Sequence, residues 1–229
     1  MTYAVSNLYG RLEKFEKLTK KINFKDRDVM YILGNIVDFG EDSVSLVNEL
    51  STRYNVYCVL GEHDYKAYVL LSEFDRILKN GQAPSADFSL NMIEWAQNGG
   101  QATLEAFKDA DSDEKEGFLE FLSDLPVFEE VNICGKDFIL TCRGVSNFDP
   151  NGDLYDYELD SFINGHLDID KTYYDDKTMV VGYLDYEHTP AGQGGKLLAK
   201  NGNIALACDM SENDDVVCVC LETNDVYYV

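Results

Sequence analysis

The sequence predicts an α/β fold, and two observations carry that prediction. Short apolar runs rich in valine, isoleucine, tyrosine and cysteine recur along the 229 residues, as is typical of buried strands. Helical patterns separate the first three runs and fill the middle third, after which strand-like runs return. Single α/β domains reach this length, so we expect one domain over residues 1–229 with a helical insertion at about residues 65–126.

The first third of the chain alternates expected strands and helices. Strands are expected in "YAV", "VMYIL" and "VYCVL". In "RLEKFEKLTKKI", apolar residues at spacings of three and four predict one buried helix face: Leu12, Phe15, Leu18 and Ile22. The second helical segment, "DSVSLVNEL", opens with the capping candidates Asp42 and Ser43.

Helices followed by strands are expected in the rest of the chain. "SLNMIEWAQNGG" stops at a glycine pair, which favours a helix end there. "SDEKEGFLEFLSDLP" begins with acids and stops at Pro126, which agrees with the dipole and the end of a helix. Strands are expected again in "DFIL", "TMVVG", "NIALA" and "VVCVC".

The charge of the chain excludes two classes of partner. With 42 acidic against 19 basic residues, the formal net charge is −23. Because this field repels phosphate backbones and anionic lipid, we expect no nucleic-acid and no membrane partner. No apolar run is long enough to span a bilayer, and "MTYAVSNLYG" lacks the pattern of a secretory signal. We therefore expect a cytoplasmic protein whose six scattered cysteines are reduced and mostly buried.

Polar or cyclic side chains follow five of the expected strands. The loops read "SNLYG", "NIVDFG", "EHDY", "TCRG" and "YLDY", each after an apolar run. Ligands of open α/β sheets bind at the carboxyl ends of strands, so these loops predict a common site.

The order of these loops resembles the calcineurin-like metallophosphoesterases, in particular the bacterial serine/threonine phosphatases and the diadenosine-tetraphosphate hydrolases. The family pattern is roughly GDxHG, GDxVDRG, GNHE/D, HAG and GHTP, and the counterparts here are "SNLYG", "GNIVDFG", "GEHD", "TCRG" and "GYLD". "WAQNGGQAT" and "FLSDLP" are also similar to family segments, so the resemblance covers essentially the whole chain. It implies a four-layer αββα sandwich of two mixed β-sheets flanked by helices.

The chemistry of the family depends on two divalent ions that bind phosphate and activate a bridging hydroxide. The resemblance implies six protein ligands, and all six positions are substituted in this chain: Asn7, Tyr9, Asn35, Glu62, Cys142 and Tyr183. Amides, phenols and a thiol are poor ligands for a pair of hard cations, and one glutamate cannot replace the set. Phe39 stands where the resemblance places a phosphate-clamping arginine. We therefore expect no metal and no cofactor.

Two residues keep the identity that the family has at their positions. His63 matches the general-acid histidine, and Asp38 matches the carboxylate that orients it. Without a metal-bound water there is nothing for them to activate, so we favour a vestigial dyad that fixes a loop. A nucleophile formed by Cys142 with His63 is an alternative. So is a shifted register in which His188 of "EHTPAG", rather than Tyr183, is the last ligand position.

Three functional hypotheses follow. The first is a catalytically inactive pseudophosphatase that binds a protein or a small molecule, or whose cleft is simply plugged by its own rings. That cleft would be lined by Tyr9, Tyr183, Phe39 and Asn7. The second is a residual serine/threonine phosphatase-like hydrolase that holds one Mg or Mn ion. Its ligands would be Glu62, Asp38 and Asn35 with His63 or His188. The third is a regulator that competes with an active phosphatase for its partner.

Overall fold

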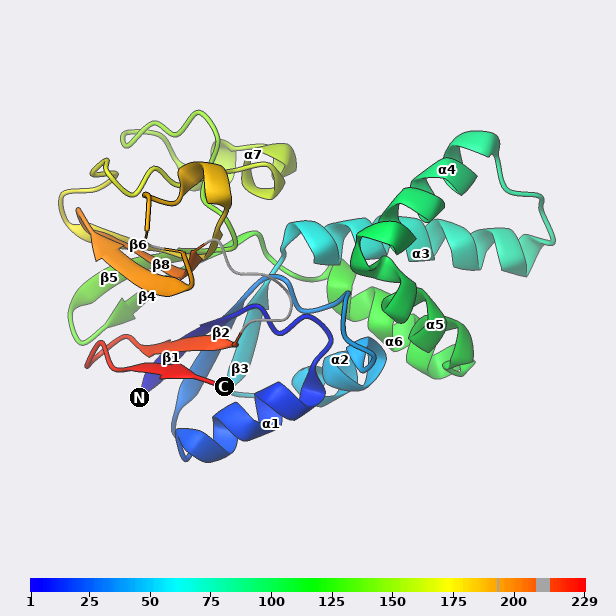
Figure 1. Cartoon of the computed structure of the whole chain (residues 1–229), viewed down its shortest axis with the longest axis horizontal. Coiled ribbons are helices and arrows are strands. Elements are labelled where there is room, and N and C mark those ends of the chain that lie inside the picture. Colours follow the sequence, from blue (N-terminus) through cyan, green and yellow to red (C-terminus); the bar gives the residue numbers. More distant parts are fainter. Residues whose placement is uncertain (193, 209–214) are drawn as a thin grey trace.

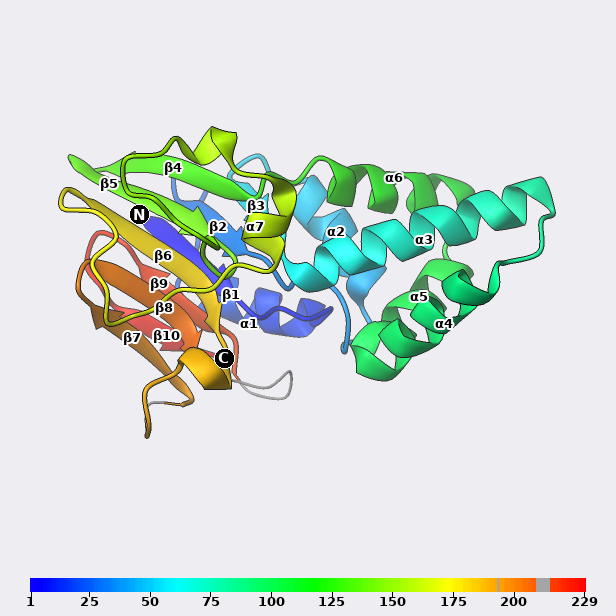
Figure 2. The same cartoon turned by 90° about the horizontal axis from the view of Figure 1, so that it is seen from above.

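A computed structural model of the chain describes residues 1–192, 194–208 and 215–229. Its strands form two five-stranded mixed sheets that pack face to face (Figures 1 and 2). The first sheet has, in spatial order, β10 (Val226–Tyr228), β9 (Val217–Cys220), β1 (Thr2–Ser6), β2 (Val29–Leu33) and β3 (Val56–Val59). The second sheet has, in spatial order, β4 (Phe128–Ile133), β5 (Lys136–Thr141), β6 (Lys177–Leu184), β8 (Asn203–Cys208) and β7 (Lys196–Lys200). Strands β1–β2–β3 and β5–β6–β8 run parallel.

Helices cover the outer face of the first sheet and extend beyond one end of the sandwich (Figure 2). They are α1 (Leu12–Lys21), α2 (Ser43–Ser51), α3 (Glu62–Asn80), α4 (Ala86–Trp95), α5 (Gln101–Asp109) and α6 (Ser112–Ser123). The outer face of the second sheet is covered by the short helix α7 (Leu159–Ile163) and irregular chain around it. In the described part of the chain, no helix is both long and apolar enough to cross a membrane.

The two sheets contact each other through a core of small and branched side chains. Ala4, Leu33 and Val59 of the first sheet pack with Leu140 and Val180 of the second. The sheets approach closely at Gly182 of β6, where an added Cβ would lie 2.2 Å from the carbonyl oxygen of Leu33. Only glycine permits this approach.

The α/β fold with two mixed sheets and flanking helices is confirmed, and the structure adds details that the sequence patterns did not indicate. Strands β4, β7 and β10 were not expected, and all three lie at sheet edges. The expected loop "EHDY" is the first turn of α3, because the Asp64 carboxylate accepts the backbone N–H of Gly61 at 2.9 Å and starts the helix. Helix α4 ends at Trp95, before the glycine pair, and the chain kinks at Asn98 and Gly99 (φ = 101°) before α5 begins.

Candidate functional site

Five loops meet at the edge where the parallel strands end. They follow β1, β2, β3, β5 and β6, and between them lies a pocket of about 230 Å³. The pocket is lined by Tyr9, Asn35, Glu62, His63, Arg143, Tyr183 and Asp185. The expected common site therefore exists, and four of the six substituted ligand positions line it.

The first two loops keep an unusual backbone. Asn7, Tyr9, Asn35, Asp38 and Phe39 all have positive φ, between 47° and 75°. Asn and Asp tolerate this left-handed conformation, whereas it costs a bulky residue about 1–2 kcal/mol. Backbone hydrogen bonds hold the loops together, since the N–H of Tyr9 donates to the carbonyl of Asn35 at 2.8 Å. The local shape of the loops is thus fixed by the backbone rather than by the side chains in the pocket.

The amide and phenol side chains of these loops bond to one another. Asn35 Nδ2 donates to the Tyr9 hydroxyl at 3.1 Å and, less closely, to Asn7 Oδ1 at 3.4 Å. Ser6 Oγ donates to the same Asn7 oxygen at 3.2 Å. Asn7 is 1% exposed, and its Nδ2 has no hydrogen-bond partner within the described residues. Three former ligand positions have therefore become a hydrogen-bonded cluster.

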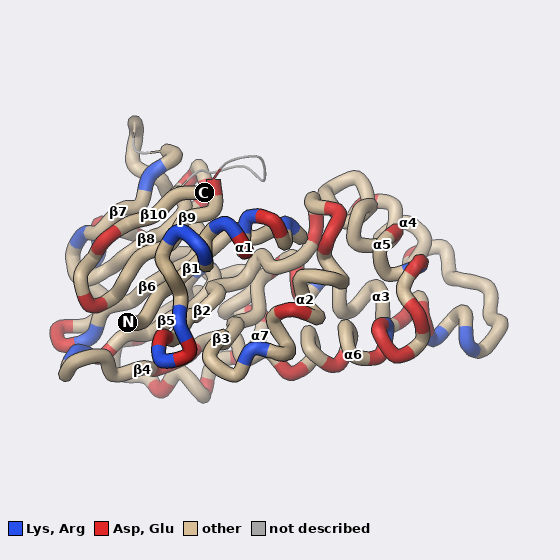
Figure 3. The backbone as a smooth tube through the Cα atoms, turned by 90° about the horizontal axis from the view of Figure 1, so that it is seen from below, with Lys and Arg blue, Asp and Glu red and all other residues tan. Residues whose placement is uncertain are grey.

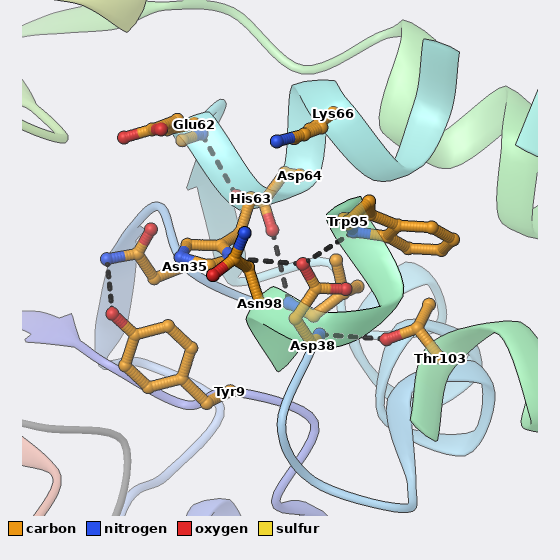
Figure 4. A network of polar contacts seen from close by, with 12 residues as sticks. Tyr9, Asn35, Asp38, Glu62, His63, Asp64, Lys66, Trp95, Asn98 and Thr103 are labelled. Carbon is orange, nitrogen blue, oxygen red and sulfur yellow. Dashed lines mark hydrogen bonds and ion pairs between the residues drawn. The ribbon is translucent and has the colours of Figure 1, made fainter. Parts of the chain in front are cut away.

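His63 and Asp38 form the expected pair. His63 Nδ1 lies 2.9 Å from Asp38 Oδ2, which also accepts the indole N–H of Trp95 at 2.9 Å (Figure 4). The backbone N–H of Asp38 donates to Thr103 Oγ1 at 2.9 Å, which ties the loop to α5. Burial alone would lower the pKa of His63, but the hydrogen bond and charge of Asp38, with further acidic neighbours, raise that pKa above its usual value.

Phe39 fills space beside this pair. The ring centroids of Tyr9, Phe39 and His63 lie 5.1–5.5 Å from one another, which is normal packing for aromatic rings. Phe39 also covers Gly99, where an added Cβ would lie 2.6 Å from the ring. Phe39 therefore lines a groove along α5 and not the pocket, contrary to expectation, and its ring offers no donor to a phosphate.

Arg143 and Asp185 are pocket residues that the sequence analysis missed. Arg143 connects two of the acidic groups at the pocket. Its Nη1 donates to Glu62 Oε2 at 2.7 Å and its Nη2 to Asp185 Oδ2 at 2.5 Å. The guanidinium carbon lies 5.7 Å from the centroid of the Tyr183 ring. His188 Nδ1 lies 2.6 Å from the other oxygen of Asp185. Burial would raise the pKa of Asp185, but the hydrogen bonds and charge of His188 and the charge of Arg143 lower it.

Asp64 and Cys142 are buried and contact the loop that follows β2. Asp64 Oδ1 accepts the backbone N–H groups of Ile36 and Val37 at 2.8 and 3.1 Å, so α3 holds the second loop in place. Burial raises the pKa of Asp64 to about 6, against the lowering effect of these hydrogen bonds. Cys142 packs on Gly34, and burial raises its pKa to about 12, so its thiol stays protonated and is a poor nucleophile.

Comparison with known proteins identifies the family. The family model for calcineurin-like phosphoesterases matches residues 3–226. The chain belongs to the calcineurin-like phosphoesterases. Members of this family typically use divalent metals.

The curated relatives match this chain over only part of their length. Symmetrical bis(5'-nucleosyl)-tetraphosphatases of Pseudomonas putida W619 and Buchnera aphidicola (strain Sg) are 29% and 31% identical over 102 and 98 residues. Each match covers 41% of this chain and 34–36% of the relative. The chain thus matches about a third of the length of these curated relatives.

Solved structures with little sequence identity share the fold. A crystal structure described as a candidate diadenosine tetraphosphatase has a TM-score of 0.64 and 18% identity, and the match covers 100% of this chain and 92% of that one. A serine/threonine phosphatase of Saccharomyces cerevisiae has a TM-score of 0.54 and 12% identity, with 100% and 78% covered. At these identities the likeness shows the fold alone.

The donor set of this phosphoesterase homologue does not fit a pair of divalent ions. Asn7 presents a buried N–H donor, Cys142 a protonated thiol, and Glu62 is bound to a guanidinium. A fixed guanidinium also repels cations at short range. Across the described ranges, no three His, Cys, Asp or Glu side chains are grouped as a metal site requires.

The structure places the remaining candidate residues as follows. Tyr183 lines the pocket, whereas His188 lies behind Asp185 and lines a different hollow, so the geometry favours Tyr183 as the counterpart of the last ligand position. Asp38 is buried behind His63 and does not line the pocket. The set that the residual-enzyme hypothesis needs is therefore divided between the pocket, the interior and a neighbouring hollow.

Proposed function

We propose that this chain is a catalytically inactive phosphoesterase homologue, a pseudophosphatase that acts by binding. One observation carries the proposal: side chains at the positions that the resemblance implies as ligands bond to other protein groups, since Asn35 donates to the Tyr9 hydroxyl and Glu62 accepts from Arg143. The pocket keeps hydroxyl, amide and imidazole groups around a small polar volume. These groups suit a protein side chain or a small polar molecule as the bound partner.

The test measures metal content and hydrolysis in the same sample. The protein is purified with added Mn²⁺ and Mg²⁺, its metal content is determined, and it is assayed with p-nitrophenyl phosphate and diadenosine tetraphosphate. We expect no stoichiometric metal and no turnover above a protein-free blank. Diadenosine tetraphosphate is included because the matched relatives are named for bis(5'-nucleosyl) tetraphosphate chemistry.

The retained His63–Asp38 pair favours a second candidate, a residual Mg- or Mn-dependent phosphoesterase, because its 2.9 Å hydrogen bond would suit a general acid. Stoichiometric bound metal, together with turnover that the His63→Ala variant loses, would establish this candidate and overturn the inactive one. Glu94→Gln is the control, since Glu94 is exposed and pairs only with Lys66 among the ion pairs of the described residues. Turnover that both variants retain would indicate a contaminating hydrolase.

A further inference from the structure

Arg143 lies among the former metal-ligand positions of the last three loops. Its guanidinium donates to Glu62, lies over the ring of Tyr183, and belongs to the residue after Cys142. Its second carboxylate partner, Asp185, comes from the end of β6. One side chain thus joins the ends of β3, β5 and β6, which are three of the five strands at which the resemblance places ligand positions.

We infer that the Arg143 guanidinium is a built-in cation that replaces the metal ions of this site. This inference deepens the proposed function, since it names what neutralises the remaining acidic groups of the pocket. Two carboxylates, Glu62 and Asp185, converge on one permanent positive charge. Arg143 and Asp185 are 22% and 25% exposed, so water screens this pair less than it screens surface pairs. Glu62 is 46% exposed, so its pair with Arg143 is screened more.

Removal of the guanidinium would leave two carboxylates facing a vacated polar volume. Their mutual repulsion would no longer be balanced, so the loops after β3 and β6 would lose stability. Carboxylate oxygens together with the nearby Asn35 carbonyl group are the donors that Mg²⁺ and Mn²⁺ prefer. An Arg143→Met variant would therefore bind one divalent ion that the natural protein does not bind.

The experiment compares thermal stability with and without Mn²⁺ in three proteins. They are the natural chain, Arg143→Met, and the control Arg53→Met, whose arginine pairs with the single carboxylate of Glu49 and lies 5.1 Å from the Phe15 ring. We expect Arg143→Met to melt roughly 4–8 °C lower than the natural chain. Mn²⁺ should restore at least half of that loss in Arg143→Met and leave the other two proteins unchanged.

Calorimetric titration with Mn²⁺ gives a second readout. Arg143→Met should bind close to one ion per chain, and an added Glu62→Gln substitution should abolish this binding. A folded Arg143→Met that neither binds Mn²⁺ nor gains stability from it would overturn the inference. So would a natural chain that Mn²⁺ stabilises as strongly as the variant.

Two further variants decide the matter if Arg143→Met fails to fold. Glu62→Gln and Asp185→Asn keep the arginine and each removes one of its partners, whereas Glu49→Gln removes the partner of Arg53. Both pocket variants should lose more thermal stability than Glu49→Gln, and equal losses would overturn the inference. None of these readouts depends on catalysis, so the inference can fail while the chain is still inactive.

Discussion

At the scale of single residues, the buried carboxylate of Asp38 determines the state of the pocket histidine. One of its oxygens accepts both the His63 and the Trp95 hydrogen bonds, while the other has no partner within the described residues. The raised pKa of His63 has a physical consequence for the stability of the chain. A protonated His63 stabilises the folded chain.

Asp38→Asn should lower the pKa of His63, because the main cause that raises it is removed while the lowering effect of burial remains. The natural chain gains stability from imidazolium below the unfolded-state pKa and loses it as the pH rises through the raised folded-state pKa. The stability difference between natural chain and variant should therefore be larger at about pH 5.5 than at about pH 8.5.

NMR titration of the His63 imidazole checks the lowered pKa. Urea unfolding at the two pH values checks the stability difference. Glu94→Gln serves as the matched control for loss of a carboxylate, and it should leave the His63 titration unchanged. A pH-independent stability difference between the natural chain and Asp38→Asn would contradict the assigned role of the pair.

At the scale of elements, sequence patterns predicted the interior strands and missed three edge strands, β4, β7 and β10. β1, β2, β5, β6, β8 and β9 are nearly continuous apolar runs because both of their faces are covered. In contrast, β4 and β7 carry acidic or lysine side chains that face water, and β10 has three half-buried residues. Edge strands are commonly short and charged, so their patterns resemble loops.

Helix α6 begins with a capping box, in which the side chains of two residues bond reciprocally to backbone N–H groups of the first turn. This cap can be tested by substitution. Asp111 Oδ1 accepts the N–H groups of Asp113 and Glu114 at 2.9 Å. In return, Glu114 Oε2 accepts the backbone N–H of Asp111 at 2.9 Å. Asp111→Ala should therefore cost about 1 kcal/mol, or roughly 2–4 °C in melting temperature. Asp113→Ala, which removes a carboxylate from the same turn and leaves the cap, should cost less. Equal losses in a thermal melt would contradict the cap.

At the scale of the whole molecule, acidic residues outnumber basic ones by 42 to 19, and Figure 3 shows them spread over both the strand and the helical parts of the chain. A net charge of −23 repels itself in the folded state, and most ion pairs of the described residues are exposed and therefore weak. Raising NaCl from about 20 to about 500 mM should thus raise the melting temperature, because salt shortens the screening length. A fall in melting temperature would mean that attractive pairs outweigh the repulsion.

The candidate site was predictable only in part from the sequence. The resemblance located the loops, His63 and Asp38. The partners of Arg143 lie 81 and 42 residues away in the sequence, so no local sequence pattern could predict these contacts. The arginine directly after a former ligand position, in "TCRG", was the available signal. The one-domain organisation and the cytoplasmic location stay predictions.

The left-handed turns at Asn7 and Asn35 bear on how the protein could be re-engineered. Because backbone hydrogen bonds help to hold these turns, acidic and imidazole groups could be introduced by substitution without rebuilding the main chain. Arg143 would have to be replaced as well, because its guanidinium bonds both Glu62 and Asp185.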